Sequence, residues 1–215
     1  NNPPTLTTFI DRFLVTAQAY SIKVILVFNK IDSYKVEEKS EILYLKDIYE
    51  TIGYTCVEVS AIKNINLNII KDLMKGKTSL FSGHSGVGKT TLLNSLEPGL
   101  NLKTKEISFQ HQQGQHTTTF AEMFDLSFDA KIIDTPGIKG FGVVEIEKEE
   151  LGDYFTEFFA LKSGCKFHNC IHVNEPQCAV KEALEDEKIS WSRYKSYLGP
   201  ITTSFLSNFL KASLM

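Results

Sequence analysis

The chain has 215 residues, of which 42% are hydrophobic and 23% charged, with a formal net charge of −3. This is the composition of an ordinary globular protein with one or two domains, and the charge gives no global basic surface for nucleic acid. No apolar run has the length of a membrane span, and residues 1–12 lack the basic start and apolar middle of a signal peptide. A cytoplasmic protein that contacts no membrane is therefore expected.

The first third of the chain contains two predicted strands that flank a predicted helix. Residues 22–30 and 54–60 are apolar, β-branched runs of strand length. Residues 36–52, between them, have the spacing and charge of a helix.

Three further strands are predicted between residues 78 and 137. Residues 78–83 form the first, which is followed by a glycine-rich loop and a helix that begins near Gly88. Residues 120–127 and 130–137 are interpreted as two strands joined by a tight turn at 128–129. Strands that alternate with helices predict an α/β fold with a largely parallel sheet.

The character of the sequence changes after about residue 147. Residues 149–162 and 179–198 have helical patterns, and a cluster of cysteine and histidine lies between them. We therefore expect an α/β domain over residues 1–147 and a small helical domain over residues 148–215.

Residues 83–90, GHSGVGKT, match the phosphate-loop pattern G-x-x-x-x-G-K-[ST] between a predicted strand and a predicted helix. Glycines allow the backbone to curl, so that successive N–H groups point at phosphate oxygens. Lys89 is placed to reach the β- and γ-phosphates, and the hydroxyl of Thr90 can ligate Mg²⁺. A glycine-rich turn with a chance lysine is the alternative, which the flanking elements disfavour. The predicted contacts are Gly83, His84, Ser85, Gly86, Val87, Gly88, Lys89, Thr90 and Thr91.

Residues 29–32, NKID, follow a predicted strand, where α/β sheets present their ligands. The carboxylate of Asp32 can accept two hydrogen bonds from guanine, whereas adenine would leave it unpaired. The residues VSAIK (59–63) also end a strand and could offer a backbone N–H to the carbonyl of the base. The predicted base contacts are Asn29, Lys30, Ile31, Asp32, Ser60 and Ala61.

Residues 134–137, DTPG, complete the set of nucleotide motifs. Asp134 can hold Mg²⁺ through water, and Gly137 can sense the γ-phosphate. Ordinary GTPases place the phosphate loop first, then a switch threonine, DxxG, NKxD and the SA loop. In this chain NKID and the SA loop precede the phosphate loop, so the set is complete but circularly permuted, a change that preserves contacts.

Three of the four cysteines lie within residues 165–178, together with two histidines. In a reducing compartment this clustering favours a metal over disulfides. Cys165, Cys170 and Cys178, with either His168 or His172, fit a tetrahedral Zn²⁺ site that is filled by protein and therefore structural. The rival interpretation is a disulfide plus one free thiol.

Taken together, these motifs resemble the RsgA/YjeQ family of circularly permuted GTPases, which assist maturation of the small ribosomal subunit. The resemblance runs from residue 8 to about residue 198 and includes GQHTTT (114–119) and the Cys/His segment 165–180. It implies a permuted P-loop GTPase domain followed by a small α-helical zinc-binding domain, with GTP or GDP, Mg²⁺ and one structural Zn²⁺ bound. It also implies a monomeric late assembly factor of the 30S subunit, whose GTP state gates binding to the subunit and its rRNA.

The resemblance assigns residues that the motifs leave open. It selects His172 as the fourth zinc ligand. It also makes residues 104–119 the switch segment, from which Thr118, or alternatively Thr117, closes on Mg²⁺. The predicted magnesium ligands are Thr90, Thr118 and Asp134.

The group that positions the attacking water is not given by the motifs. Ile138 follows DTPG, where many GTPases keep a glutamine, and an isoleucine cannot orient water. His116, a backbone group or a partner is expected to take this role, with a solvated switch histidine as the alternative interpretation of His116. The family usually has arginine where Gln115 stands. The predicted catalytic residues are Lys89, Thr118 and His116.

Two other functions fit part of the pattern. A non-catalytic module that binds ribonucleoprotein in response to guanine nucleotides would explain Ile138 as lost hydrolysis. An ATPase is disfavoured by Asp32. The family normally carries an N-terminal OB-fold domain, so we expect this sequence either to be a fragment or to lack that domain.

Overall fold

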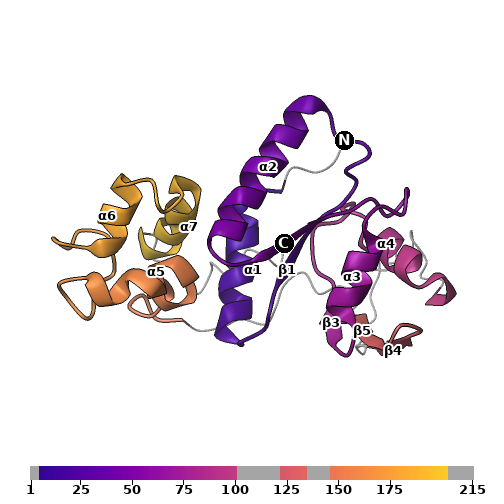
Figure 1. The fold of residues 1–215 in the computed structure, drawn as a ribbon. Coiled ribbons are helices and arrows are strands. Elements are labelled where there is room, and N and C mark those ends of the chain that lie inside the picture. The colour runs from indigo at the N-terminus through magenta and orange to yellow at the C-terminus, as the bar shows by residue number, and fades with distance from the viewer. Residues whose placement is uncertain (1–4, 101–121, 135–145, 203–215) are drawn as a thin grey trace, which may run out of the picture. The chain divides into compact units, whose positions relative to one another are not determined.

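A computed structural model describes residues 5–100, 122–134 and 146–202 (Figure 1). The chain divides into two compact units, each described here by itself. Among the described residues, unit 1 contains 25–47, 55–100 and 122–134, and unit 2 contains 5–24, 48–54 and 146–202. Each of these units combines separate segments of the sequence, whereas the predicted domains, residues 1–147 and 148–215, are two continuous segments. The predicted division stays a prediction.

The strands of unit 1 pair in two groups. Strand β1 (Ile25–Phe28) pairs in parallel with β2 (Thr55–Glu58), with Ile25 opposite Thr55. Strand β3 (Thr78–Leu80) pairs in parallel with β5 (Ala130–Asp134), which also pairs antiparallel with β4 (Glu122–Leu126). The mixed α/β fold is therefore confirmed, with one antiparallel hairpin beside the parallel pairs.

Helices supply part of the core of unit 1. Helix α4 spans Lys89–Leu96 and is followed by a 3₁₀ turn at Pro98–Leu100. Helix α2 spans Val36–Thr51, and its buried residues, Ile48 and Tyr49, belong to unit 2. Helix α3 (Leu67–Met74) was not predicted, although it buries residues at helical spacing. The core residues of this unit are Val57, Val59, Ala61, Leu67, Ile70, Met74, Leu92, Leu93, Leu96, Leu126, Ala130 and Ile132.

Unit 2 is helical among its described residues. It contains α1 (Thr7–Ala19), α5 (Thr156–Leu161), α6 (Ala179–Glu185) and α7 (Trp191–Thr202). Two 3₁₀ turns, Leu151–Tyr154 and Lys162–Gly164, flank α5. Helix α1 contacts α7, so a segment from the start of the sequence packs on one near its end. The core of this unit includes Phe155, Phe158, Tyr194, Tyr197, Leu151 and Ile189.

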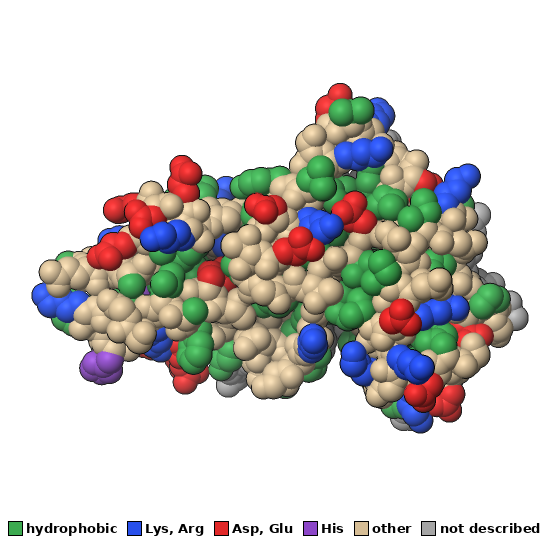
Figure 2. Space-filling view, viewed as in Figure 1, with side chains coloured by type: hydrophobic (Ala, Val, Ile, Leu, Met, Phe, Trp, Pro, Cys, Tyr) green, Lys and Arg blue, Asp and Glu red, His purple; other side chains and the backbone are tan. Residues whose placement is uncertain are grey.

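The described surface carries charges of both signs. Figure 2 shows Lys and Arg side chains interspersed with Asp and Glu on the face in view rather than gathered by sign. No helix among the described residues combines the length and the apolar character needed to cross a bilayer.

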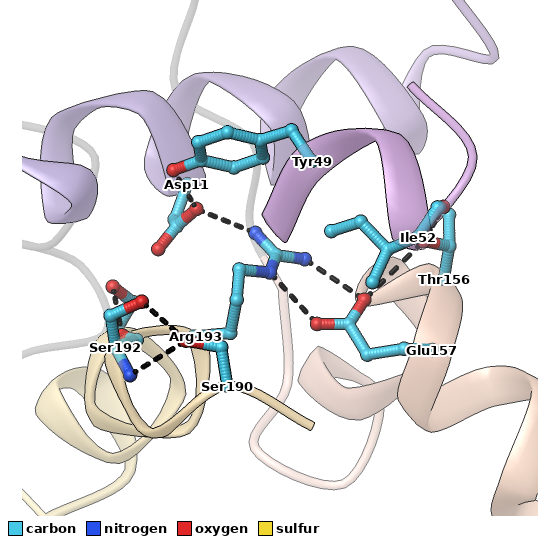
Figure 3. Close-up of polar contacts among 9 residues, drawn as sticks. Asp11, Tyr49, Ile52, Thr156, Glu157, Ser190, Ser192 and Arg193 are labelled. Atoms are coloured by element: carbon cyan, nitrogen blue, oxygen red, sulfur yellow. Dashed lines mark hydrogen bonds and ion pairs between the residues drawn. The ribbon is translucent and has the colours of Figure 1, made fainter. Parts of the chain in front are cut away.

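A buried ion network joins the helices of unit 2 (Figure 3). The guanidinium of Arg193, from α7, donates to Asp11 of α1 at 2.7 Å and to both oxygens of Glu157 of α5 at 2.8 and 3.0 Å. The Tyr49 hydroxyl donates to the same Asp11 oxygen at 2.9 Å. Arg193 is 1% exposed, and it also lies 4.6 Å from the Phe155 ring centre. Because these charges are removed from water, each depends on its partners.

Replacing Arg193 by Met is expected to lower the free energy of unfolding by about 3–5 kcal/mol, because two carboxylates lose their shared cation in a buried place. Lys195→Met, at an exposed position of the same helix, is the matched control and should change little. Urea denaturation of both variants measures the difference. Equal stability of the two variants would show that the network contributes nothing to the fold.

Candidate nucleotide-binding site and metal centre

The phosphate loop lies between β3 and α4, as its sequence pattern predicts. Gly86 and Gly88 have φ of 83° and 93°, a region that residues with a Cβ rarely adopt. A Cβ on Gly88 would lie 2.5 Å from Nδ2 of Asn29. Glycine at this position therefore meets a backbone requirement and also allows a close approach by the NKID loop.

Lys89 begins α4 and its side chain turns back into the loop. Its ammonium donates to the carbonyls of Gly83 and His84 at 2.5 and 2.8 Å. Burial lowers the pKa of Lys89. The loop thus encloses one cation, which an anionic ligand such as a phosphate could share.

The side-chain amide of Asn29 joins three loops. Its Nδ2 donates to the carbonyl of Val87 in the phosphate loop at 3.1 Å. Its Oδ1 accepts from the backbone N–H of Lys30 at 2.8 Å and from that of Ala61 in the SA loop at 3.2 Å. Lys30 adds a second link, because its ammonium donates to the Gly86 carbonyl at 2.5 Å. Both parts of the amide are used, so the base loop and the phosphate loop are held as one assembly.

Asp32 and Ser60 meet in the same assembly. The hydroxyl of Ser60, which is fully buried, donates to Oδ1 of Asp32 and accepts from the backbone N–H of Lys63 at 3.1 Å. One carboxylate oxygen of Asp32 is thereby fixed in direction.

The structure adds residues that the sequence did not indicate. The Tyr34 hydroxyl donates to the carbonyl of Asn29, and burial raises the pKa of Tyr34. The Ser95 hydroxyl of α4 donates to the Ala61 carbonyl at 3.0 Å. Neither residue belongs to a nucleotide motif, and only the folded chain brings them to the loops.

One small pocket opens beside this assembly. The predicted residues that line it are Asn29, Lys30, Asp32, Ala61, Gly88 and Thr91. Ile62, which was not predicted, also lines it and is 70% exposed. Ile31 instead donates its backbone N–H to the Val59 carbonyl at 3.2 Å and does not line the pocket.

The predicted residues of the DTPG motif and of the switch segment are only partly described by the structure. Asp134 ends β5, whose parallel neighbour β3 leads into the phosphate loop, so its backbone lies at the same edge of the sheet. The remaining predicted residues, Gly137, Thr118, His116, Thr117, Ile138 and Gln115, lie outside the described part of the chain.

Four side chains in unit 2 form a compact set of metal-ligand atoms. The ligand atoms of Cys165, Cys170, His172 and Cys178 all lie within 4.8 Å of one another. Nδ1 of His172 lies 3.3 Å from Sγ of Cys178 and 3.7 Å from Sγ of Cys165. A tetrahedral Zn²⁺ with Zn–S bonds of about 2.3 Å separates its ligand atoms by about 3.8 Å, so the set fits the ion.

The alternatives considered for this cluster fit the structure less well. His168 is exposed and is not part of the set, whereas His172 is 1% exposed. The sulfurs of Cys165 and Cys178 are 4.0 Å apart, about twice the length of a disulfide bond.

Burial controls the protonation of the cluster. It raises the pKa of Cys170 to about 12, raises that of Cys178, and lowers that of His172. A bound cation would compensate the thiolate charge of Cys170 and Cys178, so binding of a metal at this centre would release protons.

The fold and the paired loops define the class of this protein as a P-loop nucleotide-binding protein with circularly permuted motifs. A family model described as RsgA GTPase matches residues 1–144. The chain belongs to this family, as the resemblance of its motifs indicated.

Curated relatives and solved structures agree with this assignment. "Small ribosomal subunit biogenesis GTPase RsgA" of Christiangramia forsetii is 65% identical over 92% of this chain and 63% of the relative. The protein of the same name from Flavobacterium psychrophilum is 64% identical over 92% of this chain and 61% of the relative. The chain thus spans less than two thirds of the length of these relatives.

Two crystal structures have the same fold. YjeQ from Thermotoga maritima has a TM-score of 0.77 at 39% identity, and the match covers 91% of this chain and 65% of that chain. YloQ, described as a circularly permuted GTPase, has a TM-score of 0.73 at 30% identity, and the match covers 98% of this chain and 65% of that chain.

Replacing Gly88 by Ala tests the close packing of the loops. Gly76→Ala is the matched control, because Gly76 also has a positive φ but a Cβ there would meet nothing within 4 Å. Both variants place a Cβ on a left-handed backbone, and only Gly88→Ala forces a contact with Asn29. We expect Gly88→Ala to cost about 1–3 kcal/mol more in urea denaturation. Equal losses of unfolding free energy in the two variants would mean that Asn29 moves away from the new Cβ without destabilising the protein.

Proposed function

We propose that this chain binds guanine nucleotides and hydrolyses GTP as a biogenesis factor of the small ribosomal subunit. The observation that carries the proposal is the amide of Asn29, which unites the base loop, the SA loop and the phosphate loop around one pocket. The names of the relatives support the ribosomal role. GTP and GDP are therefore the proposed ligands.

Selectivity for guanine is assigned to Asp32. Its oxygen bound by Ser60 directs the carboxylate, which would accept from the N1–H and the 2-amino group of the base. Adenine offers an acceptor at N1 and no 2-amino group, so Asp32 would lose both partners. The pocket would thus select guanine over adenine because adenine leaves the Asp32 carboxylate without hydrogen-bond partners, and not because of the shape of the pocket.

In the proposed hydrolysis, residues of this chain act mainly by neutralising the negative charge of the phosphates. Lys89 neutralises charge that develops on the β- and γ-phosphates during in-line attack by water. Thr90 follows Lys89 in α4, and Asp134 ends the strand beside β3, so both fit a magnesium site at this edge. Mg²⁺, held by Thr90, Asp134 and Thr118, supplies further neutralisation when bound. His116 is proposed to position water.

The metal centre is proposed to hold one structural Zn²⁺. Cys165, Cys170, His172 and Cys178 would fill all four tetrahedral positions, which leaves no place for a reactive water. The ion would act as a cross-link within unit 2.

The proposed partner is the 30S subunit with its rRNA, bound as a late assembly step by a monomer in the cytoplasm. The second candidate function is a non-catalytic module that binds the subunit in a nucleotide-dependent way. The observation favouring it is Ile138, which stands where many GTPases have a water-orienting glutamine.

Phosphate release from GTP, with and without purified small subunits, tests the proposal. Lys89→Ala should lower turnover about 10²-fold, because it removes a preorganised cation from the transition state. Lys75→Ala, an exposed lysine of the same unit, is the matched control. Binding of GTP without turnover in either condition would leave the non-catalytic module as the function.

Asp32→Asn tests the assignment of the base. The amide donates where the carboxylate accepts, so the variant should favour xanthosine over guanosine nucleotides, with a loss of about 1–3 kcal/mol in guanine binding. Titration with fluorescent GDP and XDP measures both affinities. An unchanged order of affinities, or a similar effect of the exposed control Asp72→Asn, would contradict the role of Asp32.

A further inference from the structure

The loop that carries His172 is held by hydrogen bonds from a side chain that is not itself a metal ligand. The carboxylate of Glu175 accepts the backbone N–H of Ile171 at 2.8 Å, of Val173 at 2.9 Å and of Asn174 at 3.0 Å. These three amides surround His172 in the sequence. One side chain therefore fixes the turn from which this ligand projects.

The backbone of His172 is held from a second direction. Its φ is 57°, a left-handed conformation that residues other than glycine adopt uncommonly. The Tyr194 hydroxyl donates to the carbonyl of His172 at 2.7 Å, and the Tyr197 hydroxyl donates to the carbonyl of Ile171 at 2.6 Å. Both tyrosines belong to α7 and are almost completely buried.

The imidazole of His172 is oriented by its neighbours. A Cβ on Gly152 would lie 3.2 Å from both Cδ2 and Nε2, so backbone closes the ring edge across from Nδ1. The Phe158 ring packs edge-on at 5.8 Å between centres. Nδ1 is left facing the sulfurs of Cys165 and Cys178.

We propose that Glu175 and Tyr194 are positioning residues of the metal centre, which set the His172 backbone so that Nδ1 points at the three thiols before an ion binds. This inference rests on the proposed zinc site and deepens it. The hydrogen bonds of Glu175 and Tyr194 to this loop are made to backbone groups, and neither residue belongs to the set of ligand atoms. Because these residues order the loop beforehand, binding of the ion would not have to offset the conformational entropy lost in ordering it.

Each residue has a conservative variant that removes only the interaction in question. Glu175→Gln keeps one acceptor oxygen and places an amide donor against backbone N–H groups, which are also donors. Tyr194→Phe keeps the ring and deletes the hydroxyl. The matched controls in the same unit are Glu185→Gln and Tyr20→Phe, both at exposed positions.

Competition with a chromogenic chelator measures the Zn²⁺ affinity of the purified chain and of each variant. We expect the dissociation constant to rise about tenfold or more in Glu175→Gln and in Tyr194→Phe, and to stay unchanged in the controls. Co²⁺ binding should still give the absorption of a tetrahedral site with thiolate ligands, because the four ligands remain. Wild-type affinity in both variants would overturn the inference while leaving the zinc site itself intact.

Amide hydrogen exchange on the metal-free chain separates positioning from a general loss of stability. The amides of Ile171, Val173 and Asn174 should be protected without metal in the wild type and exchange faster in Glu175→Gln. Rapid exchange of these amides in the metal-free wild type would overturn the inference, because the loop would then be ordered by the ion. Failure of the wild type to bind Zn²⁺ or Co²⁺ would instead overturn the proposed metal centre and the inference with it. Should Glu175→Gln not fold, Tyr194→Phe decides alone.

Discussion

The nucleotide site depends on one side-chain amide. Asn29 donates through Nδ2 to the phosphate loop and accepts through Oδ1 from its own loop and from the SA loop. An aspartate at this position would lack the donor, and an alanine would lack both groups. Because a single planar group fixes the relation among three loops, the pocket for the base and the cradle for phosphate are set together. The hydrogen bonds of Lys30 to Gly86 and of Ser60 to Asp32 then add to this arrangement of the three loops.

Such an arrangement explains how the motifs come together in an altered order along the chain. In this chain the base loop precedes the phosphate loop by more than fifty residues, yet the two are joined by direct hydrogen bonds. Hydrogen bonds and packing depend on positions in space and not on the order of the segments along the chain. Circular permutation therefore changes the connections between elements and leaves the chemistry of the site in place.

Much of this site could be predicted because its signals are local. NKID, the SA loop and GHSGVGKT each combine fixed residue types with a strand end, and the cysteine spacing restricted the metal ligands to a few residues. Helix α1 was not predicted because its buried face includes the charged residue Asp11. A charged residue in the sequence indicates an exposed position, and only the structure shows that Arg193 pairs with Asp11. Tyr34 and Ser95 carry no motif and reach the loops only through tertiary structure. Thr118, His116 and Gly137 remain predictions, since they lie outside the described residues.

The partners of Asp11 have a consequence for dissecting this chain into pieces. The family match ends at residue 144, whereas Arg193 and Glu157, which neutralise and bind Asp11, lie beyond it. A fragment cut at that boundary would keep α1 with its buried carboxylate and the apolar Val15, and it would discard the core residues that pack with Val15. The evolutionary module and the folding unit of this protein therefore have different borders, and a truncation that follows the first would break the second.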